Sequence, residues 1–89
     1  MNKIRRYRPA FFEGYEEETV EFSTLEELLN IKWVKGFTKR DDFHRFALSD
    51  SDNLMATYKH GYEWWVVGTI EDPEGLDLPK HVYKKLKQA

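Results

Sequence analysis

The three histidines are the first candidates for chemistry, because imidazole can bind a metal ion or exchange a proton near neutral pH. His44, His60 and His81 lie far apart along the chain. None of them has another histidine or a pair of carboxylates at the i, i+4 spacing that zinc sites on a helix use. We therefore predict that the histidines have structural roles, and that the protein uses no metal ion and no cofactor.

Clustered carboxylates are the second candidate. The stretch that begins at Asp50 resembles the start of a calcium-binding loop, but Met55 and Gly61 stand where such a loop needs a glycine and a glutamate. The acidic runs at 16–18 and 71–74 are predicted to be solvated, whereas acid/base catalysis needs a carboxyl group in a cleft. The sequence also has no phosphate-binding loop and no nucleophile motif. We therefore predict that the protein is not an enzyme.

Aromatic and charged side chains on a strand offer a third kind of chemistry, because they can form the centre of a protein interface or stack on bases. One face of a predicted sheet collects such residues, and they are Phe43, Arg45, Tyr58, Glu63 and Trp65. We predict that these five form the contact surface of a non-enzymatic binding or accessory protein.

Two kinds of partner fit that surface. A protein partner, including a second copy of the chain in a dimer, would use the aromatic side chains and the arginine as hot spots. Single-stranded nucleic acid would stack on the aromatic side chains while the basic termini contact phosphates. The net charge of −2 and the lack of a ribonucleoprotein-type motif favour a protein over nucleic acid. We predict a protein partner, with nucleic acid as the alternative and no membrane partner.

Three strand-like runs carry this surface. They are Phe43–Ser49, Asn53–Lys59 and Tyr62–Ile70. His60-Gly61 is predicted to be a two-residue hairpin loop, because glycine tolerates a positive φ. The polar cluster at 50–52 favours a turn between the first two runs. The sequence thus predicts a β-meander.

The predicted hairpin loop fixes the register of the last two strands. Thr57 lies opposite Trp64 in this register, and Leu54 lies opposite Val67. Both faces of the meander are rich in apolar side chains, so both need cover from protein or from a partner. We take the more continuous apolar face as the main core, and therefore predict that Trp64 is buried and that Trp65 is at least partly exposed.

The strict alternation of a strand assigns every side chain to one face. The predicted core face carries Phe46, Leu48, Met55, Tyr62, Trp64, Val66 and Ile70, with His44, Thr57 and Lys59 toward its end. The other face, predicted to be partly exposed, carries Phe43, Ala47, Leu54, Ala56, Tyr58, Trp65 and Val67, with Arg45 and Glu63.

A first short helix is predicted at Thr24–Asn30. Its N-terminus matches a capping box in two registers, one formed by Ser23 with Glu26 and the other by Thr24 with Glu27. The leucines that follow repeat at helical spacing and form one apolar stripe.

The remaining segments are predicted from local patterns. Lys3–Arg8 is expected to be a strand at a sheet edge, and Thr19–Phe22 a short strand. Ile31–Val34 fits helix or strand, and strand is favoured. Pro79–Lys87 is expected to be a second helix, because proline suits the first helical position.

These elements and the composition predict one α+β domain spanning residues 1–89. Its antiparallel sheet would have about five or six strands, with a C-terminal three-stranded meander and two short helices. The 89 residues include no cysteine, no apolar run as long as a membrane span and no apolar stretch behind the basic N-terminus. We therefore expect a cytoplasmic protein. The order of a short acidic-capped helix, a tryptophan-containing segment and a meander resembles small proteins of Gram-positive bacteria and their phages, without a family motif that matches residue by residue.

Charges are segregated along the chain. Residues 1–8 carry four basic side chains, and residues 9–30 carry seven acidic ones and no basic one. The C-terminal residues 80–89 are again basic. Either basic segments lie beside acidic ones and neutralise them, which is favoured, or the two basic ends form one patch for an acidic partner.

Overall fold

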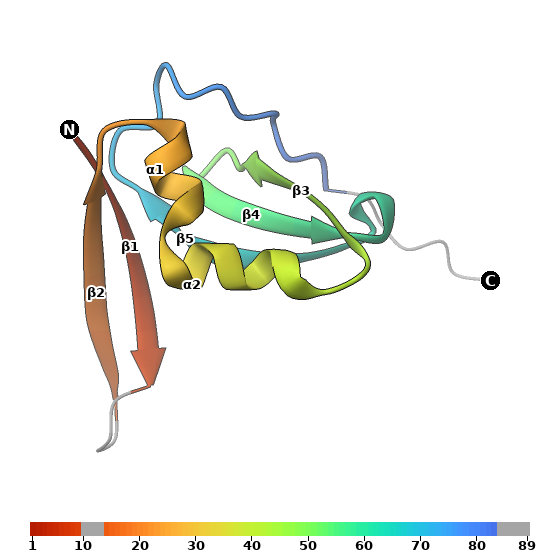
Figure 1. Cartoon of the computed structure of the whole chain (residues 1–89), viewed down its shortest axis with the longest axis horizontal. Helices are drawn as coiled ribbons and strands as arrows, with labels where there is room; N and C mark the ends of the chain where they lie inside the picture. The colour runs from red at the N-terminus through yellow and green to blue at the C-terminus, as the bar shows by residue number, and fades with distance from the viewer. Residues whose placement is uncertain (10–13, 84–89) are drawn as a thin grey trace.

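Five antiparallel strands form one sheet in the computed structural model, which describes residues 1–9 and 14–83 (Figure 1). The strands lie in the order β2-β1-β5-β4-β3. Their bounds are Asn2–Pro9 for β1, Tyr15–Phe22 for β2, Phe43–Leu48 for β3, Asn53–Tyr58 for β4 and Glu63–Ile70 for β5. The predicted α+β class and the C-terminal three-stranded meander are confirmed.

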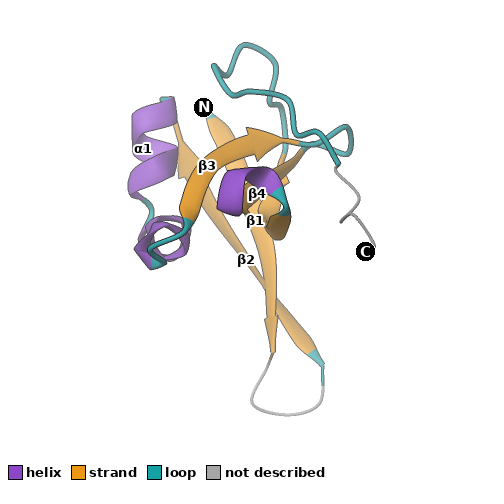
Figure 2. Cartoon of the chain, turned by 90° about the vertical axis from the view of Figure 1, so that its right-hand side faces the viewer, coloured by secondary structure: helices purple, strands orange, loops and turns teal. Residues whose placement is uncertain are grey.

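The N-terminal hairpin pairs the basic strand with the acidic one. β1 and β2 stay in register over their whole length, and Arg6–Glu18 and Arg8–Glu16 form ion pairs at 2.7 and 3.2 Å. The favoured neutralisation of charge blocks is therefore confirmed for these two segments. β1 pairs with β5 only around Ile4, so the far end of the hairpin projects from the sheet (Figure 2). The prediction that the first strand forms a sheet edge is wrong, because β2 takes that place.

Two helices cover one face of the sheet (Figure 1). In α1 (Leu25–Asn30) the Thr24 hydroxyl accepts a hydrogen bond from the backbone N–H of Glu27, and the Glu27 carboxylate accepts one from the N–H of Ser23. The second of the two predicted capping registers is therefore the one that forms. Ile31 has an extended ψ of 130° and separates α1 from α2.

α2 (Lys32–Lys35) continues into a 3-10 turn, Gly36–Lys39. The preference for a strand at Ile31–Val34 is therefore wrong. Val34 is fully buried in the core, so packing against the sheet decides the conformation of a segment whose local preference is weak.

The C-terminal segment is extended where a helix was expected. The predicted helix Pro79–Lys87 is absent over 79–83, and 84–89 lie outside the described residues. Instead, the N–H of Leu48 donates to the carbonyl of Pro79, and the N–H of His81 donates to the carbonyl of Leu48, both at 2.8 Å. The edge of β3 would otherwise leave these backbone groups unpaired, which explains why an extended tail replaces a short helix.

The core lies between the sheet and the helices. Its buried members are Ile4, Phe22, Leu28, Val34, Phe46, Leu54, Ala56, Tyr58, Val67 and Ile70. This is mainly the face predicted to be partly exposed, so the choice of core face is wrong. Trp64 is 39% exposed and Tyr62 and Val66 are exposed as well, whereas the prediction that Trp65 is exposed is confirmed.

Two β-bulges move some residues to the opposite face from the one predicted. One lies in β3 between Phe43 and Arg45, and the other lies opposite the Leu54/Met55 step of β4. Leu54 consequently faces Gly68 instead of the predicted Val67. A bulge adds one residue to one strand and reverses the alternation beyond it, which moves Phe46 and Ile70 to the helix side.

The turn between β4 and β5 is longer than predicted but keeps the register. It contains a 3-10 turn at Lys59–Gly61, with positive φ at Lys59, His60 and Gly61. Thr57 lies opposite Trp64, as predicted. Replacing a two-residue loop by a four-residue one leaves the parity unchanged, so the register survives the error in loop length.

Candidate functional site

The structure separates the five residues that were predicted to share one contact surface. Tyr58 is 2% exposed and belongs to the core, and the half-buried Phe43 ring packs against it at 5.8 Å. Arg45 pairs with Thr57 beyond the bulge of β3 and is exposed on the sheet face away from the helices. Only Glu63 and Trp65 lie together near the surface, above Tyr58. The five residues therefore do not form a single exposed surface.

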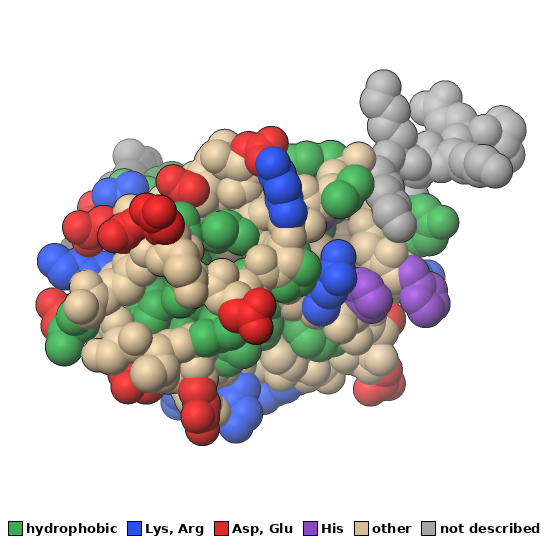
Figure 3. Space-filling model, turned by 90° about the horizontal axis from the view of Figure 1, so that it is seen from above, with side chains coloured by type: hydrophobic (Ala, Val, Ile, Leu, Met, Phe, Trp, Pro, Cys, Tyr) green, Lys and Arg blue, Asp and Glu red, His purple; other side chains and the backbone are tan. Residues whose placement is uncertain are grey.

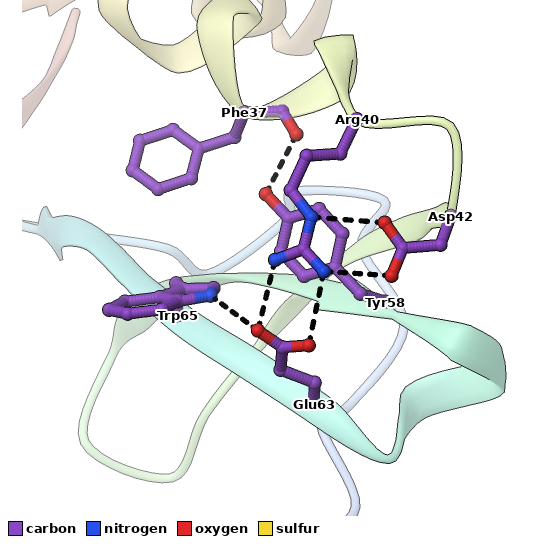
Figure 4. A network of polar contacts seen from close by, with 6 residues as sticks. All are labelled: Phe37, Arg40, Asp42, Tyr58, Glu63 and Trp65. Atoms are coloured by element: carbon purple, nitrogen blue, oxygen red, sulfur yellow. Dashed lines mark hydrogen bonds and ion pairs between the residues drawn. The ribbon is translucent and has the colours of Figure 1, made fainter.

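Arg40, which no sequence pattern indicated, contacts both Tyr58 and Glu63. Its guanidinium donates two hydrogen bonds to Asp42, at 3.0 and 2.8 Å, and two to Glu63, at 2.9 and 3.1 Å. The same group lies 4.1 Å above the ring of Tyr58 (Figure 4). A planar fork of donors suits this double bidentate arrangement, which a lysine could not reproduce.

The contacts in this cluster shift the pKa values of Arg40 and Glu63. The hydrogen bonds that Arg40 donates to Glu63 first, and then to Asp42, raise the pKa of Arg40. The hydrogen bond from Arg40, followed by the one from Trp65, lowers the pKa of Glu63. Both groups therefore stay charged near neutral pH. Because Arg40 is fully engaged by carboxylates, it acts as a rigid side of the site and not as a free cation.

Trp65 is held in place although it is exposed. Its indole N–H donates to Glu63 at 3.1 Å, and 54% of the residue's surface remains accessible. Beneath it, the Tyr58 hydroxyl donates to the backbone carbonyl of Phe37 at 2.7 Å and ties the 3-10 turn to the sheet. Burial raises the pKa of Tyr58, so this hydroxyl keeps its proton.

These residues border an open groove of about 480 Å³ between the helical layer and β5. We call it the Arg40–Trp65 groove, and it is lined by Trp33, Gly36, Phe37, Lys39, Arg40, Tyr58 and Trp65. Figure 4 shows the ring of Phe37 above the indole of Trp65, with Tyr58 to the right, behind the guanidinium of Arg40. Four of the seven lining residues are aromatic, so the groove offers mainly flat apolar surface.

One sequence signal pointed toward this arrangement. The register of the hairpin places Glu63 opposite Tyr58, which puts a carboxylate beside the core and calls for a cationic partner. The partner comes from the mixed-charge connection at 37–42, whose path along the sheet the sequence does not specify. Arg40 was therefore missed, while Glu63 and Trp65 were found.

The described part of the chain has no cluster of side chains that could bind a metal ion. Within residues 1–9 and 14–83, no group of three or more histidine, aspartate or glutamate side chains is arranged to hold a metal ion. Within the same residues, no helix is long and apolar enough to cross a membrane.

Comparisons with known proteins give no relative. No protein-family model matches the chain, and no curated protein and no solved structure matches it. The geometry of the Arg40–Trp65 groove is therefore the basis for a functional proposal.

Proposed function

We propose that the protein is a non-enzymatic binding or accessory protein that takes an apolar or aromatic side chain of a protein partner into the Arg40–Trp65 groove. The observation that carries this proposal is the exposed indole of Trp65, which is fixed by Glu63 while Glu63 is fixed by Arg40. Exposed aromatic side chains that are already ordered lose little conformational entropy on binding, and they are typical of interface hot spots.

The charges at the groove favour a protein partner over nucleic acid. Two carboxylates, those of Asp42 and Glu63, surround the guanidinium of Arg40, so this cation is already paired and is not available to a phosphate. In the basic N-terminal strand, Arg6 and Arg8 are paired with glutamates. Single-stranded nucleic acid remains the alternative, with less support at this site.

The same geometry supports a binding role over catalysis. The carboxylate of Glu63 has a lowered pKa and is held by Arg40, whereas a general acid needs a raised pKa and a general base needs to be free to accept a proton. The Tyr58 hydroxyl already donates a hydrogen bond to the backbone carbonyl of Phe37. We therefore propose a protein that works without a cofactor, and we place it in the cytoplasm as part of the same proposal.

The expected contribution of Trp65 to binding is large enough to measure. An aromatic side chain buries roughly 150 to 250 Å² when it is fully covered, and 54% of Trp65 is still available to a partner. At about 25 cal/mol per Å² of apolar surface, covering that half contributes about 2 to 3 kcal/mol, or roughly a 30- to 150-fold change in affinity.

A displayed library of random peptides, selected on the immobilised full chain, tests the proposal. The selected peptides should carry an aromatic or large aliphatic anchor, and Trp65→Ala should weaken their binding by roughly 30-fold or more. Tyr15→Ala is the matched control, because Tyr15 is 74% exposed and lies on the projecting hairpin. Equal loss in both variants, or selected peptides that bind Trp65→Ala as well as the native chain, would count against the groove.

The stability of Trp65→Ala distinguishes two causes of weaker peptide binding, a lost contact and a disrupted fold. Trp65 is exposed, so Trp65→Ala should unfold cooperatively with nearly native stability. Unfolding of that variant would mean that the indole supports the core instead of a partner. If the chain binds to itself, the indole resonance of Trp65 should shift with protein concentration. That result would identify a second copy as the protein partner.

A further inference from the structure

A second pocket lies on the sheet face away from the helices. It has a volume of about 210 Å³, several times the roughly 30 Å³ that one water molecule occupies in the liquid. We call it the histidine pocket and define it by His44, Arg45, His60 and His81. None of these residues lines the Arg40–Trp65 groove, so the two sites are independent. In Figure 3, histidine side chains lie together near one end of the surface with a basic side chain beside them.

Three separate elements bring these side chains together. The bulge of β3 allows the neighbours His44 and Arg45 to line one pocket, although adjacent residues of a regular strand point to opposite faces. His60 comes from the turn after β4, where its ring lies 5.9 Å from that of His44. His81 comes from the C-terminal segment, where its N–H donates to Leu48.

His81 is the buried side of the pocket. It is only 5% exposed, and its Nε2 atom has no hydrogen-bond partner among the described residues. The rings of Trp64 and Tyr83 lie against it, at 5.7 and 4.4 Å. Burial first, and then the positive charge of Arg45, lowers the pKa of His81. A second positive charge is thus unfavourable here unless a negative charge enters.

No carboxylate among the described residues lines the histidine pocket. Asp41 and Asp42 line a neighbouring depression together with His44 and His60. Asp42 is held by Arg40 and is not free to turn toward the pocket. Within residues 1–9 and 14–83, one permanent cation and three imidazoles therefore line the pocket without a carboxylate beside them.

We propose that the histidine pocket binds a small oxyanion, namely phosphate, either free or as the terminal group of a phosphate monoester. The guanidinium of Arg45 offers a fork of N–H donors that suits two phosphate oxygens, and imidazole N–H groups supply further charge-assisted hydrogen bonds. A metal cation is disfavoured, because Arg45 lines the pocket and no metal-binding cluster is found in residues 1–9 and 14–83.

Binding should strengthen as the pH falls, because protonated imidazoles attract the anion more strongly than neutral ones. Charged and titratable groups on the elements around the pocket include Asp41, Asp42, His44, Arg45, Asp50, Tyr58, Lys59, His60, Glu63, Lys80, His81 and Tyr83.

Side-chain NMR of the labelled full chain tests the site, with inorganic phosphate and phenyl phosphate as probes at constant ionic strength set by sodium chloride. Saturable shifts are expected at the imidazoles of His44, His60 and His81, with tighter binding at pH about 6 than at pH about 8. Arg45→Gln should weaken binding roughly tenfold or more, as expected for a charged hydrogen bond. Lys35→Gln, an exposed change on α2, should leave it unchanged.

Several results would overturn the assignment. These are shifts that do not saturate or that match those caused by chloride, equal weakening by Arg45→Gln and Lys35→Gln, and tighter binding of zinc chloride than of phosphate at the three histidines. If Arg45→Gln fails to fold, His44→Gln carries the same prediction, because His44 is also exposed. Tighter binding of phenyl phosphate would identify a phosphorylated molecule as the ligand, and equal binding would identify the free anion; both results support the site.

Discussion

Arg40 shows how single residues set the properties of the candidate groove. Its guanidinium joins a loop residue, Asp42, to a strand residue, Glu63, and covers the ring of Tyr58. The ion pairs are exposed, so their own contribution to the free energy of unfolding is small. Their effect is positional, because they fix the carboxylate that accepts the hydrogen bond of the Trp65 indole.

His81 gives a residue-scale prediction for pH dependence. Its pKa is lowered in the folded state, mainly by burial, so the unfolded chain binds a proton at higher pH than the folded one does. The free energy of unfolding should therefore decrease as the pH falls below about 6.5, the ordinary value for histidine. His81→Phe keeps an aromatic ring between Trp64 and Tyr83 and should make the dependence flatter.

Denaturant unfolding between pH about 8 and about 5 in chloride buffer measures this effect. The range stays above the region in which Glu63, whose lowered pKa acts in the same direction, would take up a proton. A native chain whose stability rises as the pH falls through this range would contradict the burial of a neutral His81.

At the scale of elements, the contact between β1 and β5 depends on a close approach of backbones. The two strands share only the pairs Ile4–Ile70 and Arg5–Thr69. A Cβ atom at Gly68 would lie 2.7 Å from the carbonyl oxygen of Arg5 and 3.0 Å from a side-chain carbon of Ile4. Glycine is thus required there by space, as it often is where two backbones approach closely.

Gly68→Ala should therefore lower the free energy of unfolding by about 1 to 3 kcal/mol, the usual cost of overpacking. Gly36→Ala is the matched control, because Gly36 has helical angles and open space around it. That control should be neutral or stabilising by up to about 1 kcal/mol. Urea unfolding of both variants checks the pair, and a Gly68→Ala protein as stable as the native chain would mean that β1 does not press against β5.

At the scale of the whole molecule, the sequence predicts what depends on alternation and turns. The pairs Thr57–Trp64 and Ala56–Trp65 follow from the hairpin and are present. The bulges in β3 and β5 leave no clear signal in the sequence, yet they decide the face of Phe46, Ile70 and every residue between bulge and strand end. The C-terminal segment is extended because its backbone pairs with the edge of β3. No local pattern in residues 79–83 predicts this pairing.

The residues of the candidate sites also differ in whether strand alternation predicts their positions. Glu63 and Trp65 are two residues apart on one strand, so the period of two places them side by side. Arg40 comes from a connection whose path is set by tertiary packing, and Arg45 changes sides because of the bulge. The three histidines are distant in sequence, and only the folded chain brings them to one pocket.

The central claim is that Trp65 receives a protein partner in the Arg40–Trp65 groove. The most direct measurement is an amide and indole correlation NMR spectrum of the labelled chain, recorded alone, with a selected peptide and with a mixed pool of single-stranded oligonucleotides. We predict that the peptide shifts the indole resonance of Trp65 together with the side chain of Arg40 and the amides of 36–39, and that the oligonucleotides do not. Peptide shifts confined to other surfaces, or oligonucleotide shifts at Trp65 that disappear with salt, would contradict the claim.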